Sequence, residues 1–257
     1  MKKTLLILGV IIIVFLVGLG IYSLINAGVS RVTFSNTQPM YGALSYDDYV
    51  ARRGSTLKAV DDNFVAMIVE KKGSTKNALG DAYKLAGDYI EAKDFDTAMK
   101  RCNQAWLIDH TSYYPYWCYS GVFIFRNDLE QAALHLEKAI SMYATSSELY
   151  ANDYLFLYRD AALVFTNLSD KYLSTDIKNA KKYSAKAIEL LSVSLKDKNL
   201  SKQFIPVESF MLAVAYFNNG SYDKARSVYD NTTQKYPEVL EMKGVVELNR
   251  HLKDKGF

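Results

Sequence analysis

The sequence predicts an all-α protein built from repeated helical hairpins, with an apolar segment at the N-terminus and a capping helix at the C-terminus. The first observation is a spacing: Ala98 is followed by Cys102, and 34 positions later Ala132 is followed by Leu136. A small residue with a larger one four positions later allows the second helix of a hairpin to pack closely on its neighbours. Second, positions 4–25 carry no charged residue. Third, none of the four prolines falls inside a proposed helix.

The apolar N-terminal segment is long enough to cross a membrane. A helix over residues 4–25, at 1.5 Å per residue, spans the roughly 30 Å hydrocarbon core of a bilayer. Lys2 and Lys3 precede it, which favours an N-terminus on the cytoplasmic side. We therefore expect residues 1–27 to be a single-pass anchor in a bacterial cytoplasmic membrane, with the following chain exported. A cleaved signal peptide is the alternative, although residues 25–27 are a poor cleavage site.

The segment after the anchor changes from irregular to helical. Residues 28–45 have no sustained apolar period and contain Pro39, so they are expected to form a linker. A first helix should begin at Tyr46 or Thr56 and end at Glu70, with an apolar face that covers the N-terminal end of the repeats.

The repeats occupy most of the remaining chain, and the helical domain as a whole is predicted over residues 46–257. Ser74 is a candidate N-cap for the first hairpin. Pro115 and Pro206 open the second and fourth hairpins, where a helix tolerates a missing N–H. The expected boundaries of the repeats and of the capping helix are 79–112, 113–146, 150–195, 206–239 and, for the cap, 238–253.

The third repeat is degenerate. Residues 167–175 add about six residues relative to a 34-residue unit, and Ser184 replaces the expected bulky side chain. This segment is either a true repeat with a longer turn, which we favour slightly, or an unrelated helical hairpin.

The pattern resembles the tetratricopeptide repeat family. The match is carried by Leu212-Ala213 and Tyr216 on a first helix, followed by Ala225 and Tyr229 on the second. The resemblance implies a right-handed solenoid of about four repeats whose concave face binds another protein or peptide. By alignment with the family, the side chains that line this face are Tyr83, Ile90, Glu91, Val122, Phe125, Arg126, Arg159, Leu163, Phe210, Val214 and Phe217.

Apolar and aromatic residues next to arginines are typical of a peptide-binding hot spot. The alternative is that these side chains are covered by the N-terminal helix or by the third-repeat insertion.

The sequence offers little support for catalysis or for a nucleic-acid partner. The formal net charge is +3, and Lys2 and Lys3 account for most of it, so no basic field is available for nucleic acid. His110, His135 and His251 are scattered, with His135 expected on an exposed helix face, and no phosphate loop or nucleophile elbow occurs. We expect no enzyme activity, no catalytic residue, no cofactor and no metal site.

The two cysteines leave two interpretations open. Cys102 and Cys118 lie on helices that should touch, so an oxidising compartment would permit a disulfide. Two buried free thiols are the interpretation that we favour at this stage.

Two functional hypotheses follow. The leading hypothesis is a membrane-anchored interaction scaffold or chaperone-like adaptor, whose concave face binds a polypeptide partner in envelope assembly, secretion or translocation. The alternative is a structural subunit of a membrane complex, with the concave face filled internally.

Overall fold

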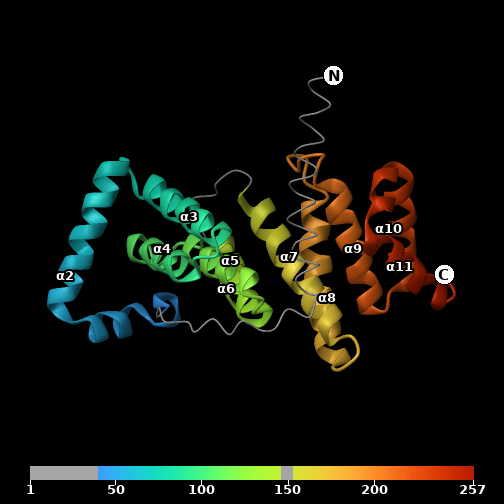
Figure 1. The fold of residues 1–257 in the computed structure, drawn as a ribbon, viewed down its shortest axis with the longest axis horizontal. Helices are drawn as coiled ribbons and strands as arrows, with labels where there is room; N and C mark the ends of the chain where they lie inside the picture. The colour runs from blue at the N-terminus through green and yellow to red at the C-terminus, as the bar shows by residue number, and fades with distance from the viewer. Residues whose placement is uncertain (1–39, 146–152) are drawn as a thin grey trace, which may run out of the picture.

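The computed structural model describes residues 40–145 and 153–257, and throughout these ranges the chain is helical or connecting, without a strand. The predicted anchor, residues 1–27, and most of the predicted linker lie outside the described residues. The hairpins α3–α4, α5–α6, α7–α8 and α9–α10 follow one another in chain order along the long axis, with α11 beside the last hairpin and α2 at the opposite end (Figure 1). The elements are η1 (Tyr41–Ala43), α2 (Tyr46–Lys72), α3 (Thr75–Glu91), α4 (Phe95–Ile108), α5 (Tyr114–Phe125), α6 (Leu129–Thr145), α7 (Asp153–Tyr172), α8 (Ile177–Ser194), α9 (Ile205–Asn219), α10 (Tyr222–Lys235), η2 (Pro237–Glu241) and α11 (Lys243–Asp254).

Helix α2 contains both of the predicted starting points. It begins at Tyr46, where the Ser45 hydroxyl accepts a hydrogen bond from the Asp48 amide at 3.0 Å. Gly54 interrupts it with φ 71° and ψ 162°, a backbone region essentially restricted to glycine. The helix therefore bends sharply just before Thr56, and its two halves diverge (Figure 1).

Local capping residues explain where the repeat helices begin. The Ser74 side chain accepts a hydrogen bond from the Asn77 amide, which confirms the predicted N-cap of α3. Asp94 and Asp176 cap α4 and α8 in the same way. Because the first amides of a helix have no partner within it, each cap satisfies one donor that would otherwise be unbonded.

The structure differs from the expected helix map in two places. The third repeat is a helical hairpin, α7 and α8, but its extra residues do not form a long turn: α7 continues to Tyr172, so they extend the helix. The capping helix begins at Lys243 rather than at residue 238, because the 3-10 helix η2 follows the turn at Pro237.

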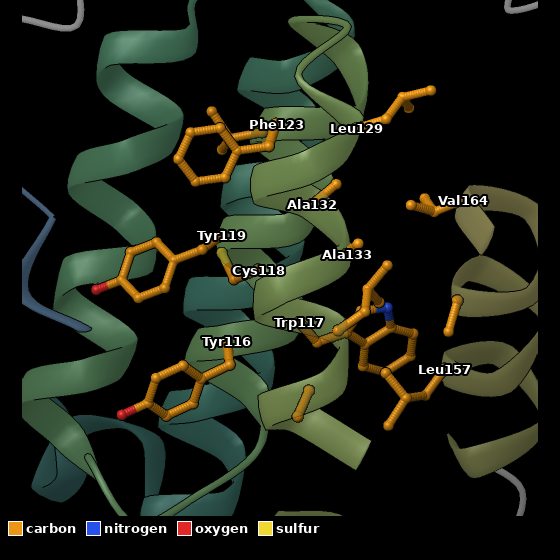
Figure 2. Close-up of a cluster of buried hydrophobic side chains, with 14 of the residues drawn as sticks. Tyr116, Trp117, Cys118, Tyr119, Phe123, Leu129, Ala132, Ala133, Leu157 and Val164 are labelled. Carbon is orange, nitrogen blue, oxygen red and sulfur yellow. The ribbon is translucent and has the colours of Figure 1, made fainter. Parts of the chain in front are cut away.

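The small residues of the repeat lie in the core, as predicted. Ala98, Ala132 and Ala225 are each 0% exposed. Figure 2 shows Ala132 and Ala133 of α6 facing Leu157 and Val164 of α7. Close packing of this kind explains why the recurring spacing marks the second helix of each hairpin.

A disulfide joins the first hairpin to the second. Cys102 of α4 and Cys118 of α5 are bonded, with their Cα atoms 5.4 Å apart, and both are buried. The favoured expectation of two free thiols is therefore wrong, because the helix packing brings the two Cα atoms within the range of a disulfide.

His135 does not lie on an exposed face as expected. It is 5% exposed, and its ring stacks on Phe123 at 5.4 Å between centroids and an interplanar angle of 3°. Among the residues that the structure describes, its Nε2 atom has no hydrogen-bond partner. Burial away from water disfavours the charged imidazolium and lowers the pKa of His135 to about 4.

Within residues 40–145 and 153–257, no helix combines the length and the apolar character that a membrane crossing requires.

Removal of the disulfide should destabilise the fold. The bond closes a loop with a sequence separation of 16, and a constraint of that size on the unfolded chain contributes about 3 kcal/mol. The double variant Cys102→Ala/Cys118→Ala should therefore lose about 3 kcal/mol of unfolding free energy in urea titrations. Free thiols that react with an alkylating agent in unreduced native protein would contradict the bond itself.

The buried His135 should make stability depend on pH. Because the folded-state pKa of about 4 lies below the ordinary value of 6.5, the unfolded chain binds the proton more readily between these values. The contribution of the neutral ring to the free energy of unfolding is fully present above about pH 6.5. This contribution is lost as the pH falls toward 4, and the loss amounts to about 3 kcal/mol in total. His135→Phe should flatten the stability curve in this window, measured by urea unfolding at several pH values. His251→Gln, at an exposed position, is the matched control, and an equal flattening by both would refute the assignment.

Candidate binding surface on the first helices

The predicted concave residues divide into three groups in the structure. Ile90 and Val122 belong to the core between α3 and α5, at 7% and 0% exposure. A methyl group on Gly121 would lie 3.4 Å from Ile90 Cδ1, so the Ile90 side chain packs against the backbone of α5. The placement of these two residues on an open surface is therefore wrong.

A second group lies beneath the C-terminal helix. Phe210 and Val214 of α9 pack against the smaller core cluster, and Gly244 of α11 is so close that a Cβ there would lie 3.2 Å from Phe210 Cζ. The Phe217 ring lies 5.9 Å from that of His251. The alternative to an open concave surface was that another segment covers these residues. The structure supports this alternative here, but the covering segment is α11 and not the N-terminal helix.

The remaining predicted residues keep some exposure. Glu91 and Phe125, at the C-terminal ends of α3 and α5, are exposed, with Phe125 at 46%. Tyr83, Arg159 and Leu163 are partly buried against the core, and Arg126 is intermediate. The structure does not test whether any of these residues binds a partner, so that role stays a prediction.

Side chains rather than close backbone packing connect α5 to α7. The Tyr113 hydroxyl donates to Asp153 Oδ2 at 3.0 Å, and the Tyr114 hydroxyl donates to the same oxygen. Four residues further along α5, Trp117 Nε1 donates to Asp160 Oδ2 at 3.0 Å. We call this the α5–α7 seam and count with it the exposed Phe125 at the end of α5; it consists of Tyr83, Tyr113, Tyr114, Trp117, Phe125, Asp153, Phe156, Arg159 and Asp160.

Arg159 is held in position by aromatic rings. Its guanidinium carbon lies 4.5 Å from the ring centroid of Phe204 and 5.0 Å from that of Phe156. One guanidinium nitrogen lies 3.6 Å from Asp160 Oδ1. Cation–π contacts on both rings restrict the guanidinium while leaving the side chain 26% exposed.

Burial shifts the acidity of the groups along the seam. It raises the pKa of Asp160, and Arg159 and the Trp117 N–H partly offset this effect. It also raises the pKa of Tyr83, whose ring packs on Trp117 at 4.9 Å between centroids. Glu208 of α9 is fully buried, which raises its pKa, with Ser194 and Arg159 acting in the opposite direction. Burial thus disfavours the charged forms of Asp160, Tyr83 and Glu208 relative to the same groups in water.

Sequence reasoning did not assign a role to the two seam carboxylates. Asp153 and Asp160 lie seven positions apart on α7, a spacing of two helical turns that places both on one face. That spacing was the available signal, but an acidic pair at this distance is also typical of a solvated helix. Among the residues that the structure describes, no three His, Cys, Asp or Glu side chains lie together as a metal site would require.

A comparison with protein-family models finds a tetratricopeptide repeat at residues 209–238. The matched segment covers most of α9, all of α10 and the turn at Pro237. No curated protein matches the chain. The chain is therefore similar to tetratricopeptide repeats at residues 209–238, and the stacked helical hairpins of the described residues are consistent with repeats of this kind.

Proposed function

We propose that this chain is a non-catalytic, membrane-anchored interaction module that binds a polypeptide segment along the α5–α7 seam. Tetratricopeptide repeats generally mediate protein–protein interaction, and the match at residues 209–238 provides that coarse expectation. The seam is a more specific site than the whole concave face, because α11 covers the corresponding residues of α9.

The exposed aromatic side chains of α5 and α7 are the observation that carries this proposal. Phe125 is 46% exposed near the end of α5, and Phe156 is 41% exposed near the start of α7. The seam also contains the partly buried Tyr83 and Tyr114, and Arg159, whose guanidinium lies against the rings of Phe156 and Phe204. Aromatic residues and arginine that lose little freedom on binding are typical of interface hot spots.

An extracytoplasmic location is part of the same proposal. Disulfides persist in oxidising compartments and are rare in the cytosol, so the Cys102–Cys118 bond favours export. Lys2 and Lys3 before an uncharged stretch at residues 4–25 favour a membrane anchor with its N-terminus inside. An anchored module would keep its binding surface at high effective concentration near membrane partners, such as secretion, translocation or envelope-assembly proteins.

A structural subunit is the second candidate. The packing of α11 over Phe210 and Val214 supports it, since this end of the concave face is filled by the chain itself. In that case the seam side chains would contribute to folding or assembly, without recognising a separate segment.

Two substitutions test the proposed surface in the full-length, membrane-expressed chain. Phe125→Ala and Phe156→Ala each remove an exposed ring, and each should reduce recovery of crosslinked partner proteins about fivefold or more, as expected for a hot spot worth at least 1 kcal/mol. Quantitative mass spectrometry of crosslinked complexes provides the measurement.

Leu134→Ala is the matched control, because Leu134 is 59% exposed but lies on α6, a second helix of a hairpin. Recovery should stay unchanged in this variant. If all three variants recover partners equally well, the seam is not the binding site. If the two phenylalanine variants instead lose folding stability, the structural-subunit candidate is favoured.

A further inference from the structure

The segment before the Gly54 bend lies against the first two hairpins as a strap. We define the strap as residues 40–53, which include η1 and the first part of α2. The Tyr41 amide donates to Asn103 Oδ1 at 3.0 Å, and the Gly42 amide donates to the Tyr119 hydroxyl at 3.3 Å. The same hydroxyl donates to Asn103 Oδ1 at 2.8 Å, so the two protein groups that receive the strap are themselves linked.

Aromatic packing completes this docking. The Tyr49 ring lies 5.1 Å from the Trp106 ring in an edge-on arrangement, and Tyr41 lies 6.0 Å from Trp106. At the start of α2, Tyr46 stacks on His110 with 4.3 Å between the ring centroids. We call the residues that receive the strap the strap-binding surface: Asn103, Trp106 and His110 with Tyr116 and Tyr119.

The strap-binding surface selects one residue type at its centre. A Cβ atom at position 42 would lie 2.5 Å from Tyr119 Cε2 and 3.4 Å from Tyr116 Cε1. Only glycine therefore fits between these rings without displacing them. A segment that takes the place of the strap must offer an aromatic residue followed by glycine, as Tyr41-Gly42 does.

The strap is attached to the rest of α2 through a hinge and a latch. Gly54 is the hinge: its φ of 71° is the only non-helical conformation within α2, and its side-chain position has no atom within 4 Å. Asp61 is the latch, since it accepts hydrogen bonds from Tyr49 and from Arg53 at 2.6 and 2.9 Å across the bend. If Gly54 became helical, α2 would run straight for 27 residues and carry the strap away from the surface.

We propose that the strap exchanges between two copies of this chain, so that residues 40–53 of one copy occupy the strap-binding surface of the other. A second copy is the occupant that the contacts favour, because its own Tyr41-Gly42 supplies every hydrogen bond and ring contact described above. Exchange about a short hinge leaves these contacts unchanged and alters only the backbone at Gly54. The fit at position 42 excludes segments that lack glycine there.

Gly54→Ala tests the hinge. Alanine strongly disfavours φ 71° with ψ 162° but favours a helix, and no neighbouring atom obstructs its methyl group. The substitution should therefore shift the population from the bent to the straight form about fivefold or more, with inter-copy exchange as the result. Asp61→Asn, which keeps Gly54 and weakens only the latch, should act in the same direction.

The measurement uses the full chain in mild detergent. The photocrosslinking residue benzoylphenylalanine replaces the exposed Tyr46. One isotopically heavy and one light preparation of this protein are mixed before irradiation. After irradiation, mixed-isotope crosslinks between position 46 and α4 report exchange. In an equal mixture, an exchanged strap gives mixed and single-isotope crosslinks in equal amounts, so only the excess of single-isotope crosslinks reports the bent form. Gly80→Ala is the matched control: Gly80 is already helical within α3 and has open space around it, so exchange should not change.

A second substitution separates strap exchange from any other dimer. Gly42→Val prevents docking in both copies, so Gly54→Ala/Gly42→Val should lose the mixed-isotope crosslinks while circular dichroism retains the helical signal. Purely single-isotope crosslinks in both Gly54→Ala and Asp61→Asn would overturn the proposal. Mixed-isotope crosslinks that persist with Gly42→Val would overturn it as well.

Discussion

Close contact between helices at alanine-sized positions is the constraint on which the rest of the structure depends. Ala98, Ala132 and Ala225 have no exposed surface, and each lies on the second helix of a hairpin. A larger side chain there would separate two helices along their whole contact, because cores packed at crystal-like density have few voids to absorb it. The disulfide between α4 and α5 reinforces the same contact in the first half of the chain.

The α5–α7 seam interrupts this regularity, and this is why it is the candidate site. Its helices are joined through Asp153 and Asp160 to tyrosine and tryptophan side chains. Of the bridging rings, Tyr113 and Trp117 are buried and Tyr114 is partly exposed, while Phe156 next to them remains 41% exposed. The strap on the first two hairpins follows a related principle, with backbone amides of η1 bound by Asn103 and Tyr119.

The sequence pattern predicted what depends on local spacing: the buried alanines, the Ser74 cap and the prolines in the first turns of α5 and α9. It did not predict features set by contacts between distant segments. The exposure of Phe210 and Phe217 depends on where α11 packs, and a period of 34 residues says nothing about the final helix. His135 was assigned to the wrong face because its burial depends on α5, which supplies Phe123. The extra residues of the third repeat lengthen α7 and do not form a longer connection. The sequence pattern could not distinguish these two outcomes, because both add the same number of residues to the repeat.

Hydrogen exchange in the variant Ala225→Leu tests the central claim most directly. Ala225 belongs to the smaller core cluster formed by α9, α10 and the C-terminal elements, whereas the larger cluster extends from α3 to α9 and meets the smaller one at Tyr216 and Val228. Overpacking there should cost about 1–3 kcal/mol, and in a stack that is held together by neighbouring contacts the loss should stay local. The account predicts faster amide exchange in α9, α10 and α11, with α3–α6 unchanged. Equal loss of protection in α3–α6, or no change anywhere, would contradict it.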